Sequence, residues 1–416
     1  MVLPEKERAI LVGVETSGKG AWPLLDSLEE LSSLTGTAGA EVTGTLTQSR
    51  DKPDLRYYIG TGKLEELKAR AASTNSNLVI FDCELTPSQT RNLEEELGIK
   101  VIDRTELILD IFAQRAHSRE GKLQVELAQA NFTLTHLTGK GVLMSRLGGG
   151  IGTRGPGETK LEMDRRVINK KISQLHKELE EVRKSRGIRR QARKSELMPV
   201  AAIVGYTNSG KSTLLNALSD ASIYADNKLF ATLDPTTRRV ILPNEQEVLI
   251  TDTVGFIQKL PHQLVEAFRA TLEEVTEADI LIHVVDASNP HVEEQIEAVF
   301  NVLEELNAIT KPIITAFNKT DKVKATQKLQ KKFKPSVLIS ALHKKGLDDL
   351  LGLVSKELEK VMVVLNFAVP IYEMNIVHLI HERGKVMKEK YEADKVLLKA
   401  KVDEITAKRL EKYIIR

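Results

Sequence analysis

The stretch Gly205-Tyr-Thr-Asn-Ser-Gly-Lys-Ser212 decides the fold of the middle of the chain. It fits the phosphate-loop pattern, with an apolar segment at residues 201–204 before it and a helical segment from Thr213 after it. Glycines let backbone N–H groups point at phosphate oxygens at a helix N-terminus, Lys211 can neutralise β- and γ-phosphate oxygens, and the Ser212 hydroxyl can ligate Mg²⁺. The stretch therefore predicts a nucleoside triphosphate site.

A strand-helix alternation surrounds this loop. We predict strands at residues 201–204, 248–252, 280–285, 313–317 and 337–339, with helices between them. This pattern is typical of a doubly wound α/β domain, in which ligands bind at the carboxyl ends of the strands. We assign residues 198–360 to this P-loop G domain.

Two further motifs follow predicted strands and define the phosphate and base contacts. In Asp252-Thr-Val-Gly255, Asp252 can reach Mg²⁺ through a water molecule, and the Gly255 amide can sense the γ-phosphate. In Asn318-Lys-Thr-Asp321, the Asp321 carboxylate can accept hydrogen bonds from N1–H and the exocyclic amine of guanine, which adenine does not offer together. Lys319 can lie along the base, and backbone N–H groups of Ser340-Ala341-Leu342 can complete the pocket. These motifs predict GTP rather than ATP.

A switch segment must supply a threonine to Mg²⁺ and the γ-phosphate, and Leu229-Phe-Ala-Thr-Leu-Asp-Pro-Thr-Thr-Arg238 stands in the right place. Thr232, Thr236 and Thr237 are all candidates, of which we favour Thr232. The predicted catalytic residues are Lys211, Thr232 and Gly255, and the predicted Mg²⁺ ligands are Ser212, Thr232 and, through water, Asp252. The predicted nucleotide-binding residues are Gly205, Tyr206, Thr207, Asn208, Ser209, Gly210, Lys211, Ser212, Thr213, Phe230, Ala231, Thr232, Asp252, Thr253, Val254, Gly255, Asn318, Lys319, Asp321, Ser340, Ala341 and Leu342.

The residue after Gly255 is Phe256, where many regulatory GTPases carry a glutamine that orients the attacking water. A phenyl ring cannot make that hydrogen bond, so we predict slow intrinsic hydrolysis that a partner or a monovalent cation accelerates. Asn208 resembles the asparagine with which some GTPases bind K⁺, and we therefore hypothesise stimulation by K⁺.

The first hundred residues predict a small parallel α/β subdomain, residues 1–104. Strands are expected at residues 9–14, 41–46, 78–81 and 100–102, and helices at 24–34, 64–72 and 87–97. Gly60-Thr-Gly-Lys63 faintly suggests a second phosphate site, but it lacks the full phosphate-loop spacing and is better interpreted as a strand-to-helix turn.

Residues 105–197 predict a long helical hairpin arm. Two helical stretches, residues 106–137 and 160–194, flank Leu147-Gly-Gly-Gly-Ile-Gly-Thr-Arg-Gly-Pro-Gly-Glu158. From Asp164 to Lys194 the chain has twelve Lys or Arg against four Asp or Glu, a local balance of +8 in a protein whose net charge is +2. A charge run on a helix is often only a solvated face, but this one, beside an Arg-bearing glycine loop, favours a surface for phosphate backbones.

The remaining features limit the kinds of protein to which the chain can belong. Residues 361–416 predict a small α+β C-terminal domain. The chain has 416 residues, a single cysteine and no apolar run long enough to span a membrane, so we expect a cytoplasmic protein without disulfides or stable membrane insertion. We expect a monomer that does not bind DNA.

With these residues in place, the chain resembles the HflX-type GTPases, a ribosome-associated class related to translation factors. Five stretches resemble the family's signatures, in family order and over nearly the whole chain: Tyr58-Ile-Gly-Thr-Gly-Lys63, Gln124-Val-Glu-Leu-Ala128, Gly149-Gly-Ile-Gly-Thr-Arg-Gly-Pro-Gly-Glu-Thr-Lys-Leu-Glu162, Phe230-Ala-Thr-Leu-Asp-Pro-Thr236 and Asp252-Thr-Val-Gly-Phe256.

The resemblance implies an enzyme that hydrolyses GTP to GDP, binds the large ribosomal subunit and splits stalled or idle ribosomes, with hydrolysis stimulated by the ribosome. It also implies that Arg154 and its neighbouring glycines contact ribosomal RNA, and it leaves open ATP as a second substrate in the N-terminal domain. Two other functions remain: an RNA-binding assembly factor for which GTP is a timer, and a nucleotide-regulated interaction protein at a membrane-protease complex.

Overall fold

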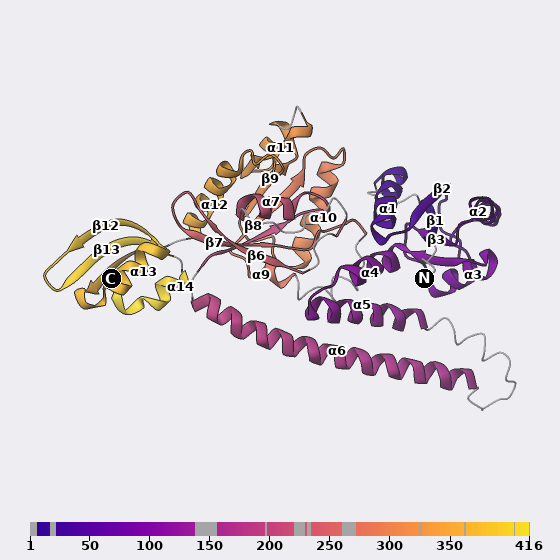
Figure 1. The fold of residues 1–416 in the computed structure, drawn as a ribbon, viewed down its shortest axis with the longest axis horizontal. Coiled ribbons are helices and arrows are strands. Elements are labelled where there is room, and N and C mark those ends of the chain that lie inside the picture. The colour runs from indigo at the N-terminus through magenta and orange to yellow at the C-terminus, as the bar shows by residue number, and fades with distance from the viewer. Residues whose placement is uncertain are drawn as a thin grey trace. The chain divides into compact units, whose positions relative to one another are not determined.

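The computed structural model describes residues 6–16, 22–137, 156–195, 198–219, 229–230, 234–259, 272–323, 327–361, 363–402 and 404–415. Contacts divide the chain into two compact units. The N-terminal unit comprises Met1–Arg183, Asp226–Asp234 and Gln258–Arg269, and the C-terminal unit comprises Lys184–Ala225, Pro235–Ile257 and Ala270–Arg416. The ribbon in Figure 1 is coloured along the chain and labels the elements of both units.

A four-stranded parallel sheet of order β2-β1-β3-β4 forms the centre of the N-terminal unit. Its strands are β1 (Arg8–Glu15), β2 (Glu41–Ser49), β3 (Leu78–Phe81) and β4 (Lys100–Asp103), and its helices are α1 (Leu24–Ala38), α2 (Thr61–Thr74), α3 (Pro87–Leu97) and α4 (Arg104–Arg115). Leu64, Leu67 and Leu93 of α2 and α3 pack with Ile10 and Val12 of β1. The predicted strands and helices of this subdomain are confirmed.

Local chemistry explains why these elements begin and end where they do. All four residues of β3 are buried, which is typical of a central parallel strand with helices on both faces. Helix α3 begins with a capping box, because the Thr86 side chain accepts from the Gln89 backbone N–H while the Gln89 side chain reaches back to Thr86. It ends at Gly98, whose left-handed backbone suits glycine.

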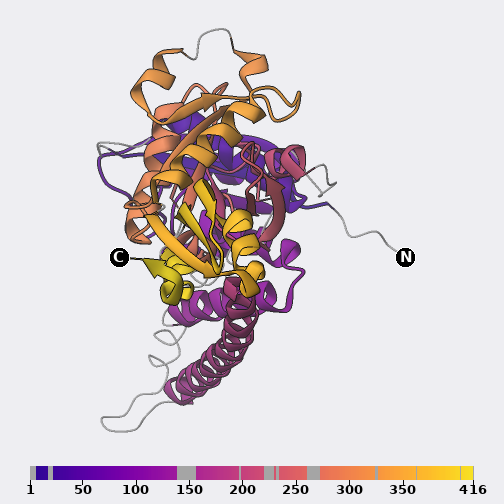
Figure 2. The same ribbon diagram turned by 90° about the vertical axis from the view of Figure 1, so that its left-hand side faces the viewer.

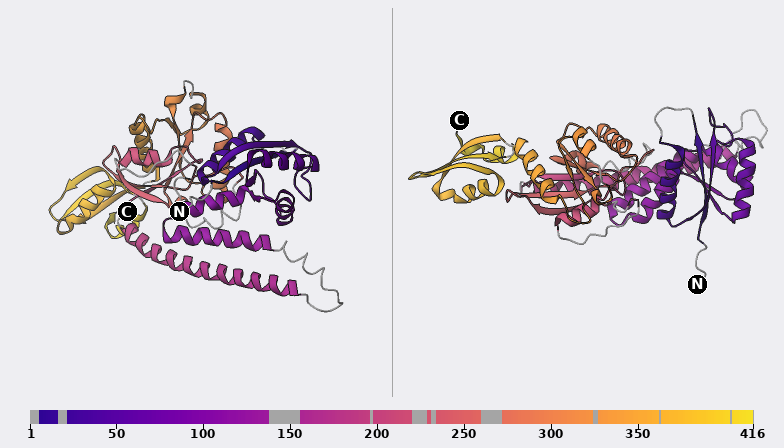
Figure 3. Two further views of the ribbon diagram at one scale, coloured as in Figure 1. Left: turned by 45° about the vertical axis from the view of Figure 1, so that its right-hand side comes forward. Right: turned by 90° about the horizontal axis from the view of Figure 1, so that it is seen from above.

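The arm contains α5 (Arg119–Leu137) and the 40-residue helix α6 (Pro156–Ser195). They lie side by side in Figures 1 and 3, and Leu123 and Leu127 of α5 pack with Leu175 and Leu179 of α6. The expectation of one helix over residues 106–137 was wrong. Helix α4 ends at Arg115, and α5 begins anew after Ser118, whose hydroxyl accepts from the Gly121 N–H at 2.9 Å.

A six-stranded sheet of order β10-β9-β8-β5-β7-β6 forms the G domain in the C-terminal unit. The strands are β5 (Val200–Val204), β6 (Thr236–Ile241), β7 (Glu247–Asp252), β8 (Ile280–Asp286), β9 (Ile313–Asn318) and β10 (Ser336–Leu338). The helices are α7 (Lys211–Ser219), α9 (Glu273–Glu277), α10 (Val292–Glu305), η2 (Thr320–Lys322), α11 (Gln327–Lys332) and α12 (Leu347–Val361). Apolar side chains of α7 and α12 pack in one core cluster, and those of α10 in another.

The sequence missed β6, which pairs antiparallel with β7 in a sheet whose other pairs are parallel. Its register aligns Thr236 with Asp252 and Ile241 with Glu247. The last three residues of the predicted switch segment, Thr236 to Arg238, therefore lie in a strand. Edge strands of this kind have one half-exposed face and a weak apolar pattern, so they give little signal in the sequence.

The chain ends in a four-stranded sheet of order β12-β13-β11-β14. Its elements are β11 (Val363–Pro370), η3 (Ile371–Glu373), α13 (Met374–Arg383), β12 (Lys385–Tyr391), β13 (Lys395–Val402), α14 (Glu404–Arg409), η4 (Glu411–Tyr413) and β14 (Ile414–Ile415). Val377 and Ile380 of α13 pack onto this sheet, and Figure 2 shows the helix beside it. None of the described helices combines the length and apolarity that crossing a membrane requires.

Candidate functional site

The phosphate loop connects β5 to α7. Neither of its two glycines can be replaced by a larger residue without a clash or backbone strain. Gly205 has φ +153, and a Cβ there would lie 2.3 Å from the carbonyl oxygen of Val284. Gly210 has φ +96, and its Cβ would lie 2.3 Å from Asn318 Nδ2. Both positions need a left-handed or crowded backbone that only glycine adopts without strain. The loop is thereby held between the ends of β8 and β9.

Lys211 carries a buried ammonium group at the start of α7. Its Nζ donates to the carbonyl oxygens of Gly205 at 3.1 Å and Tyr206 at 2.8 Å, and the residue is 7% exposed. Burial lowers the pKa of Lys211 to about 8, although the Asp252 carboxylate acts in the opposite direction. A desolvated cation held among carbonyl oxygens gains most from an anionic phosphate, so this position suits the predicted role.

Two side chains with oxygen atoms suited to metal binding meet at the predicted metal position. Ser212 Oγ donates to Asp252 Oδ2 at 2.6 Å, and Asp252 is 1% exposed. A hydroxyl and a carboxylate are hard oxygen ligands of the kind Mg²⁺ prefers when it also binds nucleotide phosphates. The residues present therefore fit a magnesium ion, which Ser212 and Asp252 would hold.

The segment after β7 is tied to the phosphate loop by its backbone. The Thr207 N–H donates to the Phe256 carbonyl at 2.7 Å, and the Phe256 N–H donates to the Gly205 carbonyl at 3.1 Å. A Cβ on Gly255 would lie 2.9 Å from Lys211 Nζ, which places this residue directly beside the phosphate-binding lysine. The Phe256 ring is 2% exposed and thus belongs to the core. Phe256 therefore contributes packing rather than a hydrogen bond at this position.

The neighbouring buried residues support this loop. Thr253 donates its hydroxyl to the Ile203 carbonyl at 2.7 Å, and Thr253 and Val254 are both buried. Thr207 and Ser209 are buried as well, whereas Asn208 is exposed with φ +58. Thr213 in the first turn of α7 is half-buried.

Asn318 at the end of β9 connects the base motif to the phosphate loop. Its Nδ2 donates to the Ser209 carbonyl at 2.9 Å, and its Oδ1 accepts from the Ala341 N–H at 2.9 Å. Lys319 Nζ donates to the Asn208 carbonyl at 2.8 Å and to Asp286 Oδ2 at 2.7 Å. Sequence reasoning missed Asp286. The available signal was its place at the carboxyl end of β8, the edge where every other motif also lies.

Asp321 lies on the short helix η2 with its carboxylate partly exposed. Its Oδ1 accepts from Ser340 Oγ at 2.5 Å, and this hydrogen bond is the main reason that the pKa of Asp321 is lowered. The carboxylate is therefore ionised at neutral pH and acts only as an acceptor. Ser340 and Ala341 are buried, while Leu342 is 71% exposed. The structure thus links Asp321 to Ser340, and Asn318 to the neighbouring Ala341.

Only part of the predicted switch segment falls within the described residues. Thr232, the favoured switch threonine, and Ala231 lie outside them. Thr237 Oγ1 lies 2.9 Å from Thr251 Oγ1, so its hydroxyl already has a partner between the strands. The Phe230 side chain is 2% exposed and its ring packs edge-on against Phe112, 4.7 Å between centroids. The ring of Phe230 is thus engaged by the core, and nucleotide binding by Phe230 stays a prediction.

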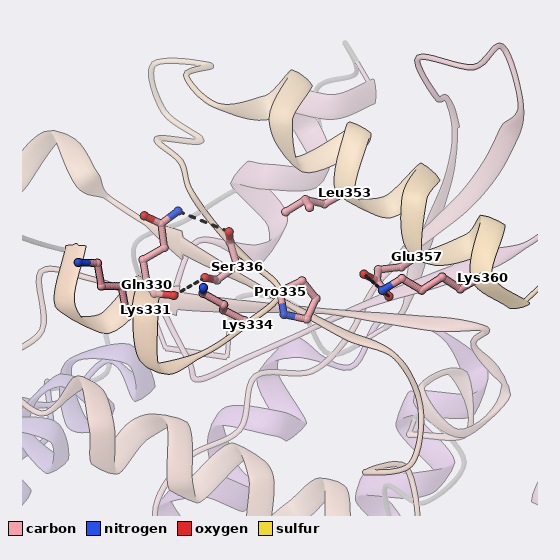
Figure 4. A pocket seen from close by; sticks show the side chains of 8 residues that line it. All are labelled: Gln330, Lys331, Lys334, Pro335, Ser336, Leu353, Glu357 and Lys360. Carbon is pink, nitrogen blue, oxygen red and sulfur yellow. Dashed lines mark hydrogen bonds and ion pairs between the residues drawn. The ribbon is translucent and has the colours of Figure 1, made fainter.

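Two other features are separate from this site. A cavity of about 550 Å³ is lined by Gln330, Lys331, Lys334, Pro335, Ser336, Leu353, Glu357 and Lys360 (Figure 4). It opens beside Ser336, where β10 begins, whereas the nucleotide motifs follow strand carboxyl ends. In the N-terminal unit, Lys63 Nζ is 2.7 Å from Glu66 Oε2. The cation of the glycine-rich turn before α2 is thus paired within its own helix.

Nucleotide affinity should depend on pH through Lys211. With a pKa of about 8, the ammonium is charged at neutral pH and loses its proton above pH 8, while bound phosphate favours the charged form. Affinity for a fluorescent GDP should therefore be nearly constant below about pH 7 and fall by up to about tenfold per pH unit above pH 8. Titrations between pH 6.5 and 9 measure this. Lys211→Arg should flatten the profile because guanidinium does not titrate there; a flat wild-type profile would contradict the assignment.

Comparisons with known proteins agree with this geometry. Residues 200–319 match the family described as "50S ribosome-binding GTPase", residues 25–113 that described as "GTP-binding GTPase N-terminal", and residues 115–193 that described as "GTP-binding GTPase Middle Region". Together these matches cover the nucleotide site as far as Lys319, without Asp321 and Ser340, and most of the N-terminal unit.

Relatives cover nearly the whole chain. GTPase HflX of Caldanaerobacter subterraneus is 50% identical over 99% of this chain and 94% of its own length. GTPase HflX of Escherichia coli is 48% identical over 76% of this chain and 73% of its own length. A solved GTP-binding protein from the archaeon Sulfolobus solfataricus, in complex with GDP, is 26% identical and aligns over 85% of this chain and 99% of that one, with a TM-score of 0.44. The chain therefore belongs to the HflX family of GTPases and is a guanine-nucleotide-binding enzyme that hydrolyses GTP.

Proposed function

We propose that this GTPase binds the large ribosomal subunit and splits stalled or idle ribosomes. In this proposal GTP orders the switch segments, the ribosome stimulates hydrolysis, and GDP releases the protein. The description of the family matched by residues 200–319, a 50S ribosome-binding GTPase, supports the choice of partner. Such a partner also places the protein in the cytoplasm.

The observation that carries the proposal is the charge on α6. Its apolar positions, including Leu175 and Leu179, pack on α5, while cationic side chains such as Arg165, Lys170 and Lys177 are exposed. A helix whose residues 164–194 have a local balance of +8, with exposed cations, releases counterions when it binds a phosphate backbone. We assign ribosomal RNA as the polyanion. Arg154 and the glycine segment to residue 155 lie outside the described residues, and α6 begins at Pro156.

The contacts of Lys211, Ser212 and Gly255 support the chemistry proposed for the site. In this proposal Lys211 holds the β- and γ-phosphates, and the Gly255 amide and Thr232 recognise the γ-phosphate. Ser212, and Asp252 through a water molecule, would hold Mg²⁺, which would supply charge neutralisation. Because Phe256 is buried and apolar, the ribosome or K⁺ must complete the arrangement around the attacking water, and Asn208 is the candidate K⁺ ligand. The structure offers no support for a second substrate, ATP, at Lys63, because the Lys63 ammonium pairs with Glu66.

Light scattering separates the leading proposal from its alternative. Intact ribosomes mixed with the protein and a non-hydrolysable GTP analogue should dissociate, with GDP as the control nucleotide. A factor that assembles ribosomal subunits and uses GTP as a timer would bind without this loss of scattering. Binding without dissociation would therefore replace the splitting proposal by the assembly proposal.

Neutralising the distal end of α6 should weaken ribosome binding without affecting nucleotide binding. We expect Gln at Arg189, Arg190, Arg193 and Lys194 to lower ribosome affinity at least tenfold at about 100 mM salt and to reduce the slope of log K against log salt by up to about 3. Sedimentation with ribosomes at several salt concentrations measures both. Gln at Lys388, Lys390, Lys399 and Lys401 in the C-terminal sheet removes the same charge elsewhere, and an equal effect of that control would refute a specific role for α6.

A further inference from the structure

Two segments that follow nucleotide motifs belong to the N-terminal unit rather than to the G domain. They are Asp226–Asp234, before β6, and Gln258–Arg269, shortly after Gly255. Within them the structure describes residues 229, 230, 234, 258 and 259. Each segment continues directly into residues of the nucleotide site, so its attachment to the N-terminal unit bears on how that site responds to nucleotide.

Asp234 attaches the first segment to the amino end of α5. Its carboxylate accepts from the His117 N–H at 3.2 Å, from the Ser118 N–H at 2.8 Å and from the Ser118 hydroxyl. Gly121 in the first turn of α5 leaves room for it, because a Cβ there would lie 2.7 Å from Asp234 Oδ1. Free N–H groups at a helix start attract a carboxylate by hydrogen bonding and by the helix dipole. Asp234 therefore acts as a cap supplied from a distant part of the chain.

Lys259 attaches the second segment through a buried charge cluster. Its Nζ donates to Asp82 Oδ2 at 2.5 Å, to the Asp82 carbonyl at 3.1 Å and to Ser27 Oγ at 3.0 Å. Asp82, 3% exposed, also accepts from Arg104, and Arg104 pairs with Glu30. Two carboxylates and one guanidinium leave a net negative charge, which Lys259 neutralises. Asp82 and Arg104 are buried, whereas the Lys259 side chain is 41% exposed, so Lys259 covers the cluster from its solvent side.

Phe230 adds a third anchor. Its ring packs edge-on against Phe112 of α4, and both Phe230 and Lys259 have left-handed backbones, with φ of +55 and +53. In the sequence, Phe230 and Asp234 stand two positions before and two positions after the favoured switch threonine, Thr232. Both flanking residues contact the N-terminal unit.

We propose that Asp234 and Lys259 are positioning residues that tie the nucleotide-responsive segments to the N-terminal unit, so that guanine nucleotide state is coupled to the amino end of α5. Helix α5 packs along the basic helix α6, and a change at its cap is thereby passed to the arm. The coupling is reciprocal. If the cap is more stable in one nucleotide state than in the other, removing the cap must change the ratio of the two nucleotide affinities by the corresponding factor. The inference rests on the GTPase activity and holds whether or not the protein splits ribosomes.

Hydrogen exchange in the full-length protein tests the coupling. Backbone amides of His117 and Ser118 donate to Asp234, so in the wild type their exchange should differ at least threefold between the GDP-bound form and the form bound to a non-hydrolysable GTP analogue. Asp234→Ala should abolish this difference and change the ratio of the two nucleotide affinities at least threefold. Ser118→Ala removes the hydroxyl that donates to Asp234. It should diminish the exchange difference between the two nucleotide-bound forms while preserving the fold.

Asp54→Ala is the matched control. Asp54 lies in the same unit and also accepts from backbone N–H groups, those of Arg56 at 2.8 Å and Tyr57 at 3.0 Å, and it has no hydrogen bond to the described residues of either segment. It should leave the nucleotide-dependent exchange difference intact. Lys259→Met should reduce the difference as Asp234→Ala does. A wild-type difference of less than threefold, or a difference that survives in both Asp234→Ala and Lys259→Met, would overturn the proposal.

Discussion

Replacing Lys211 with Ala should weaken GTP and GDP binding by about 10² to 10⁴-fold. The ammonium group lies at the start of α7 beside Gly255, and phosphate binding adds charge-assisted hydrogen bonds worth about 1.5–3 kcal/mol each. The free energy of unfolding without nucleotide should change by only about 1 kcal/mol, because losing a buried charge offsets losing two hydrogen bonds to carbonyl oxygens. Hydrolysis should fall below detection at ordinary nucleotide concentrations.

Calorimetric titration with GDP, together with thermal unfolding with and without GDP, measures these effects separately. Wild-type protein should be stabilised by GDP, about 2.7 kcal/mol at a hundredfold excess over Kd, and Lys211→Ala should show no such stabilisation. Lys63→Ala is the matched control, since Gly60-Thr-Gly-Lys63 has similar residues before a helix but Lys63 pairs with Glu66. If Lys211→Ala binds GDP within tenfold of the wild type, the phosphate site has been assigned wrongly.

Much of the G domain was predictable because its signals are local. A phosphate loop joins adjacent elements, and the motifs at Asp252 and Asn318 follow apolar strands, so topology alone brings them to one edge of the sheet. The parallel strands of the N-terminal unit were equally clear, since buried strands such as β3 consist of continuous apolar residues.

The features that sequence reasoning missed depend on contacts between distant residues. The break between α4 and α5 occurs in a stretch of helical periodicity, and the carboxylate that caps α5 is Asp234, more than a hundred positions away. Asp286 becomes part of the base site only because Lys319 reaches it from the next strand. Lys259 is one lysine among many in the sequence, and its role depends on a buried cluster formed by Asp82 and Arg104. Periodicity contains no information about such pairs.

Changing Asp321 to Asn should remove the preference for guanine. The Asp321 carboxylate keeps one oxygen on Ser340 and is ionised at neutral pH, because that hydrogen bond lowers its pKa. It can accept from both N1–H and the exocyclic amine of guanine, whereas an Asn amide offers one acceptor and sets its NH₂ against one of those donors. Sites built to match a hydrogen-bonding pattern discriminate by up to about 10⁴–10⁵-fold, so we expect GTP affinity to fall by about 10²–10³-fold.

Competition between GTP, ATP and xanthosine triphosphate provides the decisive measurement. Xanthine carries a carbonyl oxygen in place of the exocyclic amine, so the Asn amide can donate to it, and Asp321→Asn should bind xanthosine triphosphate more tightly than GTP. Asp349→Asn, an exposed carboxylate in the first turn of α12, is the matched control and should keep the GTP preference. If Asp321→Asn still prefers GTP, the carboxylate does not recognise the base. If Asp321→Asn gains binding of xanthosine triphosphate, the base lies opposite residue 321. A nonspecific loss of folding would instead weaken the binding of all three nucleotides together.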